Sequence, residues 1–114
     1  MDSILMSIKM LLGISENDTY FDKPLVMHIN QAIFPLTQIG IGPKGGFVVR
    51  DDNTSWSEFM PDESPIKVEW VKSCVYYRVR LAFDPPSSQS LLQSINDQIK
   101  ECENRLLIAS ETGV

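Results

Sequence analysis

The most chemically suggestive stretch lies near the middle of the chain, where Gly40–Trp56 reads GIGPKGGFVVRDDNTSW. Its glycines and Lys44 suggest a phosphate-binding loop. Such a loop needs its glycines before the lysine, a Ser or Thr directly after it, and a helix whose N-terminus faces the phosphate. Here Lys44 precedes Gly45-Gly46, and the strand-like segment FVVR follows. The order, the spacing and the context therefore argue against a nucleotide site.

No other residues form a recognisable catalytic group. His28, the single histidine, lies beside apolar residues in a helical pattern. That setting is typical of a half-buried or surface histidine rather than of a general base. No serine stands in a nucleophile elbow, and the carboxylates show no repeated spacing. We predict that the protein is not an enzyme and that it uses no cofactor.

The two cysteines, Cys74 and Cys102, lie far apart, each inside an apolar helical pattern. Together with one histidine they cannot supply the four ligands of a structural zinc site. No basic start precedes an uninterrupted apolar stretch, because Lys9 interrupts residues 4–14, so we expect a protein made and kept in a cytoplasm. Both thiols are then expected to be reduced core residues, with no disulfide and no metal.

The charge balance argues against tight binding to DNA or to membranes. The net charge is −5 and the isoelectric point is near 4.7, whereas neutralising phosphates requires a concentrated basic surface. The segment VYYRVR, residues 75–80, could stack single-stranded bases, but on a helix these side chains fan around the circumference. Ion pairs of Arg78 and Arg80 with acids are the simpler interpretation. No run approaches the ~18 apolar residues of a membrane span.

The length of 114 residues indicates one domain, residues 1–114, and four segments have helical periodicity. The first is 3–12, and Gly13 is its expected C-cap. The second begins at Asp22 and runs to 39 or 40, although Pro35 predicts a kink or an early end near Phe34. We therefore predict a mainly α fold, a small bundle of about four helices.

The third helical segment, 64–83, carries two apolar stripes on opposite sides. One stripe consists of Val68, Val71, Val75, Val79 and Ala82, and the other of Ile66, Trp70, Cys74, Tyr77 and Leu81. A helix with two opposed apolar faces must be buried on both sides. Either the second face meets a neighbouring chain, or this is the central helix of the domain. The sequence leaves both possibilities open.

The fourth helical segment restarts at Ser87 or Ser88, after the break at Asp84-Pro85-Pro86. It has one narrow apolar seam: Leu92, Ile95, Ile99, Cys102, Leu106 and Ala109. The short break predicts an antiparallel hairpin with the third helix. We expect the leucines and isoleucines of the seam to be buried with the valine stripe of that helix.

Roughly two dozen residues separate the second and third helices and are predicted to be irregular or β-hairpin-like. The pattern SWSE at Ser55–Glu58 matches a capping box and predicts a single helical turn. Long loops in small domains are usually functional. We expect this loop to be mobile in the isolated subunit and to be ordered by a protein partner. Its candidate contact residues are Lys44, Phe47, Val49, Arg50 and Trp56.

Several stretches together resemble the small head–tail connector proteins, also called adaptor or head-completion proteins, of long-tailed bacteriophages and prophages. These stretches are LLGISEND, HINQAIFPLTQIGIGP, TSWSEF and VKSCVYYRVRLAFDPPSS. The resemblance covers nearly the whole chain. Its best marker is the join at Tyr76–Pro86, and the turn at Gln38–Pro43 is second. Neither motif carries chemistry, so the specificity lies in their order and spacing.

The resemblance implies a helical subunit of the virion, assembled in the host bacterial cytoplasm into a closed ring of about twelve copies beneath the portal. The ring would extend the DNA channel, through which DNA passes without specific binding, and would contact a head-closure, stopper or tail protein. The expected subunit or portal interface is Ile66, Trp70, Tyr77 and Leu81 with Arg78 and Arg80. The alternative from another class is a small cytoplasmic helical regulator or adaptor that binds one protein partner.

Overall fold

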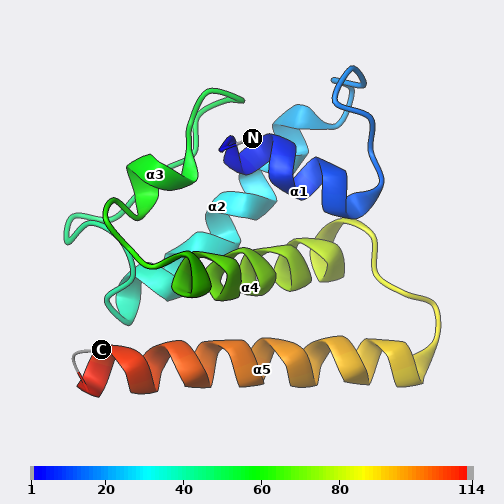
Figure 1. Cartoon of the computed structure of the whole chain (residues 1–114). Coiled ribbons are helices and arrows are strands. Elements are labelled where there is room, and N and C mark those ends of the chain that lie inside the picture. The colour runs from blue at the N-terminus through cyan, green and yellow to red at the C-terminus, as the bar shows by residue number, and fades with distance from the viewer. Residues whose placement is uncertain (1, 113–114) are drawn as a thin grey trace.

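The computed structural model describes residues 2–112, and side chains as far as residue 109. Five helices follow one another along the chain (Figure 1): α1 (Ile4–Leu12), α2 (Asp22–Gln38), α3 (Trp56–Phe59), α4 (Pro65–Phe83) and α5 (Gln89–Thr112). Four are the predicted helices, and α3 is the predicted single turn. Within residues 2–112 there is no strand, only an isolated bridge between Ser3 and Ser55. The mainly helical prediction is confirmed, and the long loop is irregular rather than a β-hairpin.

Local sequence signals set the helix ends. The hydroxyls of Ser3, Ser55 and Ser64 each accept a hydrogen bond from the backbone N–H three residues further on, at 3.2, 3.0 and 3.3 Å. Ser88 does the same before α5, at 3.4 Å. Gly13 ends α1 with φ of 79°, the left-handed conformation that favours glycine. The caps expected at Gly13, Ser55 and Ser64 are therefore present, whereas an N-cap acid at Asp22 is not, because α2 begins after Phe21 without a side-chain cap.

Of the two outcomes expected at Pro35, a kink or an early end near Phe34, the early end is excluded, because α2 continues to Gln38. A proline removes only one backbone donor from a helix. The turn around it is held by Ile33 and Leu36, which are both buried in the core. Packing against the core thus outweighs the local preference to stop.

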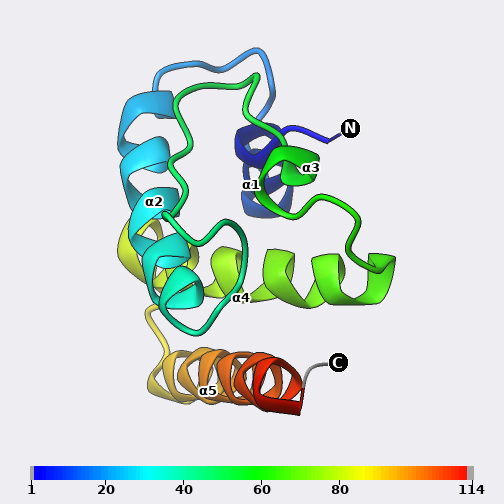
Figure 2. The same cartoon turned by 90° about the vertical axis from the view of Figure 1, so that its left-hand side faces the viewer.

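The core lies between α1, α2 and α4, with α3 and the long loop covering one end (Figure 2). Its fully buried large side chains come from every part of the chain before residue 60: Ile4, Leu5, Ile8, Leu25, Ile29, Ile33, Leu36, Ile41, Val49, Trp56 and Phe59. The irregular loop therefore contributes to the core as the helices do. The α4 helix adds Val71, Val75 and Val79.

The central element is α4, which packs against α1 and α2 on one side and against α5 on the other (Figure 1). The predicted hairpin of α4 and α5 is confirmed. Of the α5 seam, Ile95, Ile99, Cys102 and Leu106 are buried, whereas Leu92 is only half-buried. On the α4 side, Val68 is half-buried and lies near Trp56 of α3, away from the α5 side. The expected pairing of the seam with the whole valine stripe is therefore only partly correct.

Candidate interaction surfaces

The second apolar face of α4 is covered largely by α5 of the same chain. Cys74 on this face is buried, and Tyr77 and Leu81 are half-buried. Leu81 lies with Ile99 in a shallow groove between the two helices. The sequence left open whether this face meets a neighbouring chain or whether the helix is the central one of the domain. In the structure, α4 is the central helix.

Polar contacts join α4 to α5 beside this apolar contact. The Arg78 guanidinium donates two hydrogen bonds to the Glu103 carboxylate, one of them at 3.0 Å from Nη2 to Oε1. These bonds raise the pKa of Arg78. Arg80 instead reaches the Tyr76 hydroxyl and the Asp84 carbonyl, both at 3.4 Å. The predicted ion pair is confirmed for Arg78, which is thereby committed to its own chain.

The two cysteines meet across the same contact. Cys74 and Cys102 are buried and reduced, and their side chains lie close enough to interact electrostatically. Burial raises the pKa of both thiols, which keeps them protonated and unreactive. Their core position was predicted, but their adjacency follows only from the hairpin. Within residues 2–112 no group of three or more His, Cys, Asp or Glu side chains could hold a metal ion.

One end of the hairpin leaves an apolar patch in solvent. Ile66 is 73% exposed and Trp70 is 37% exposed, and together with Pro65, Glu69 and Ser73 they line an open groove of about 360 Å³. We call Ile66 and Trp70 the hairpin patch. The Arg105 guanidinium of α5 lies over the Trp70 ring, 5.6 Å from its centroid, and holds that ring in place. Of the expected interface, these two residues remain freely accessible.

The long loop is fastened to the domain at Val49. The Asn30 side chain accepts from the Val49 N–H at 2.7 Å and donates to the Val49 carbonyl at 2.9 Å. Val49 is buried, and so is Trp56, whose indole N–H donates to Ser7 at 3.1 Å. Neither side chain can reach a partner in this conformation, so both are corrections to the expected contact set. The sequence pattern predicted a surface here because the residues that pack around Val49 and Trp56 lie far away along the chain.

The other loop residues are placed differently. Lys44 and Arg50 are exposed, and Phe47 is half-buried against Phe59, with ring centroids 4.9 Å apart. At Gly42 the chain has φ of 80° and runs so close that a Cβ would lie 2.4 Å from the Phe59 ring. Only glycine fits there. The glycine stretch is therefore a turn packed on α3, and its lysine faces solvent.

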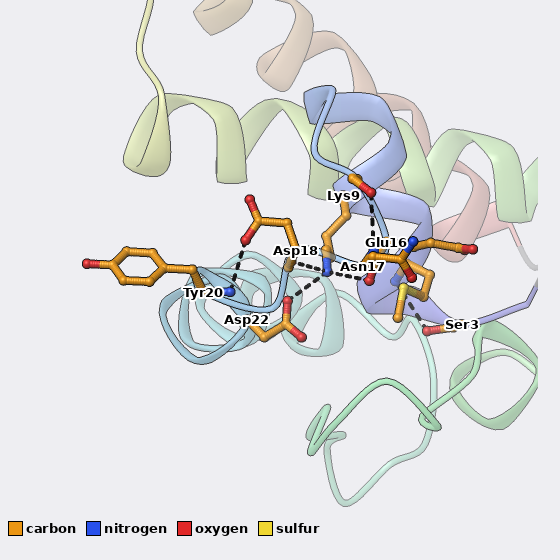
Figure 3. Close-up of polar contacts among 9 residues, drawn as sticks. Ser3, Lys9, Glu16, Asn17, Asp18, Tyr20 and Asp22 are labelled. Atoms are coloured by element: carbon orange, nitrogen blue, oxygen red, sulfur yellow. Dashed lines mark hydrogen bonds and ion pairs between the residues drawn. The ribbon is translucent and has the colours of Figure 1, made fainter.

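Lys9 is a buried charge that the sequence pattern did not reveal (Figure 3). Its side chain is 1% exposed, and its ammonium lies 2.9 Å from the Asp22 carboxylate. It also donates to the carbonyls of Asp18 at 2.7 Å and Glu16 at 3.3 Å. The ammonium therefore makes two hydrogen bonds and one ion pair. These contacts connect the loop between α1 and α2 to both helices. The only sign of them in the sequence was a lysine within the apolar face of a helix.

His28 is half-buried, as predicted, with its ring 6.4 Å from that of Phe83. No helix within residues 2–112 is long and apolar enough to cross a bilayer.

Comparison with known proteins gives one finding. The family model described as "Phage connector protein" matches residues 4–113, almost the entire chain. No curated protein and no solved structure matches this sequence significantly.

Proposed function

This chain belongs to the family of phage connector proteins, and on that premise we propose that its copies form a ring beneath the portal of the phage head. The family is a structural one, so the protein is a structural component of a bacteriophage rather than an enzyme. In the proposed role the ring extends the DNA channel, and its far side receives a head-closure, stopper or tail protein. The ring assembles in the host cytoplasm and remains in the virion.

The observation that carries this proposal, beside the family match, is the hairpin patch. Ile66 and Trp70 are apolar, adjacent on α4 and exposed, and α5 leaves them uncovered at the end of the hairpin. Tryptophan is among the residues that contribute most to protein interfaces. Arg105 holds the Trp70 ring in one orientation, which lowers the entropy lost on binding. The patch is thus a preformed anchor for the portal or for a neighbouring subunit.

The net negative charge of the chain is compatible with a ring through which DNA passes. A net charge of −5 repels the polymer, so DNA can slide past without sticking. Arg78, the cation nearest the middle of the hairpin, is already paired with Glu103. This supports passage of DNA rather than binding to it.

The test is the variant Trp70→Glu. We expect it to fold, because Trp70 lies at the solvent edge and the new carboxylate falls within reach of Arg105. We expect it to lose incorporation into purified portal-containing heads, since a charge is placed in the centre of an apolar contact. The matched control is Leu91→Glu, which changes an exposed apolar residue, 57% exposed, at the first turn of α5.

Incorporation is measured by sedimenting the heads and quantifying bound subunit, with circular dichroism as the check on folding. The proposal is supported if the Trp70→Glu variant is no longer incorporated into the heads while the Leu91→Glu variant still is. Normal incorporation and normal infectivity of the Trp70 variant would show that the hairpin patch is not the interface.

A further inference from the structure

The last helix is attached to the subunit differently from the other elements. Figure 1 and Figure 2 show α1 and α2 on one side of α4 and α5 by itself on the other side. The largest fully buried side chains all belong to residues before 60. Detaching α5 therefore uncovers one face of α4 and leaves most of the core between α1, α2 and α4 closed.

The contact between α4 and α5 is specific. The Arg78 guanidinium of α4 donates to the Glu103 carboxylate of α5 at 3.0 Å, and the Arg105 guanidinium of α5 lies over the Trp70 ring of α4. Between these contacts lies the buried seam of α5, which consists of Ile95, Ile99, Cys102 and Leu106. The face of α4 thus has one occupant whose fit the structure itself demonstrates. That face fits the α5 helix of any copy of the chain equally well.

The connection between the two helices, Asp84–Ser88, is fastened only to the helix on each side of it. The Asp84 N–H donates to the Arg80 carbonyl of α4 at 2.9 Å, and the Ser88 carbonyl accepts from a backbone N–H of α5 at 3.0 Å. Pro85-Pro86 between them has no N–H and favours an extended backbone. Figure 1 shows the connection swinging out beyond the ends of both helices. Straightening the connection therefore breaks neither of these bonds.

A straightened connection carries α5 far enough to reach another copy. Residues 84–88 span up to about 16 Å when they are extended. The α5 helix has 24 residues and is therefore about 36 Å long. Connection and helix together are longer than the 39 Å that the subunit measures along its longest axis. An opened α5 can therefore lie along α4 of an adjacent copy.

We propose that in the ring α5 of each copy packs on α4 of the next copy instead of on α4 of its own chain. The inference rests on the proposed ring and deepens it, since it assigns the contact between subunits and leaves the hairpin patch to the portal. The same side chains meet in both arrangements, so the effective concentration decides between them. An isolated subunit keeps its own α5, whereas copies held side by side on the portal exchange it.

Such an exchange is head-to-tail, because each copy gives α5 to one neighbour and receives α5 from the other. Contacts of this kind close into a ring when the rotation between successive copies fits. Each copy is then held by the whole buried seam of a neighbour's helix.

The experiment reverses the charges of the Arg78–Glu103 pair one at a time. Arg78→Glu places two carboxylates opposite each other across the contact, and Glu103→Arg places two guanidinium groups there. In an equimolar mixture, exchange of α5 pairs the new acid of one chain with the new base of the other, and it pairs the two native side chains with each other. Mixing changes nothing inside a subunit that keeps its own α5.

Two variants serve as controls. The double variant Arg78→Glu/Glu103→Arg keeps an ion pair within one chain, and Asn104→Arg adds a base on the exposed side of α5, next to Glu103. Incorporation is measured by sedimenting portal-containing heads and quantifying the bound subunit. Association without heads is measured by sedimentation velocity, and circular dichroism checks folding.

We expect each single variant to be incorporated at least about tenfold less than the wild type, because like charges then face each other. The equimolar mixture should recover most of the wild-type incorporation, and both controls should be incorporated normally. Without heads, the wild type and each single variant should sediment as monomers. The mixture should form a one-to-one heterodimer, because only exchange removes the repulsion in both chains.

A mixture that is incorporated no better than the single variants, or that stays monomeric without heads, overturns the inference. Normal incorporation of either single variant overturns it as well. Failure of the proposed function is read separately, from Trp70→Glu on portal-containing heads. If that variant loses incorporation while the mixture shows no recovery, the ring proposal stands and α5 stays on its own chain.

Discussion

The buried ion pair of Lys9 and Asp22 gives an unusual prediction about stability: removing the carboxylate should cost more than removing the lysine. The ammonium is enclosed, with a side chain 1% exposed, whereas the Asp22 side chain is 24% exposed. Asp22→Asn leaves the buried ammonium without a counter-charge, because only neutral oxygens then surround it. Lys9→Met removes that charge, keeps most of the volume, and leaves a carboxylate that is partly exposed, although its Oδ1 is buried.

The magnitudes follow from these exposures. Breaking a buried pair by removing one partner costs about 3–5 kcal/mol, and the partial exposure of Asp22 lowers our expectation to about 2–3 kcal/mol for Asp22→Asn. Lys9→Met also leaves one partner unpaired, but that partner is the partly exposed Asp22 carboxylate rather than an enclosed charge, so we expect about 0–1.5 kcal/mol. The double variant should resemble Lys9→Met alone, because Asp22 has then lost its partner.

The assay is equilibrium unfolding in urea, followed by the fluorescence of buried Trp56 and by circular dichroism. Lys23→Met is the matched control, since Lys23 is exposed and next to Asp22, and we expect a change within about 0.5 kcal/mol. A larger loss for Lys9→Met than for Asp22→Asn, or additive losses in the double variant, would refute the reasoning. In that case the two hydrogen bonds and the ion pair of the ammonium outweigh its desolvation.

Two further predictions concern the α4–α5 contact. Leu106→Ala should lower the free energy of unfolding by about 2–5 kcal/mol, because Leu106 is buried in the core; a loss below about 1 kcal/mol in urea unfolding would mean that α5 is held loosely. Burial raises the pKa of Cys74 above its ordinary value of 9.0, so its stabilising contribution is complete below about pH 9 and is lost as the pH rises above it. Stability should therefore fall above pH 9 by more in the wild type than in Cys74→Ala, and equal slopes would contradict the buried, protonated thiol.

Much of the fold was predictable because its signals are local. A serine cap, a first-turn proline and a glycine after the last turn act within about four residues, so Ser64-Pro65 and Gly13 located helix ends without any tertiary information. The break at Asp84-Pro85-Pro86 likewise predicted the hairpin of α4 and α5. The family match over residues 4–113 agrees with the order of motifs along the chain.

The candidate surfaces were predicted less well. Val49 and Trp56 were expected to contact a partner because they lie in a long loop, yet Asn30 and Ser7 hold them in the core. These partners are 19 and 49 residues away along the chain.

The sequence by itself determined where most of the helices begin and end, that the chain is mainly helical, and which family it belongs to, since these depend on residues close together or on their order. Only the tertiary structure decided that α5 covers the second face of α4, that Cys74 meets Cys102, and that Lys9 is enclosed. The physical reason is that burial is a property of the space around a side chain. That space is filled by residues whose distance along the chain carries no information about their distance in the fold.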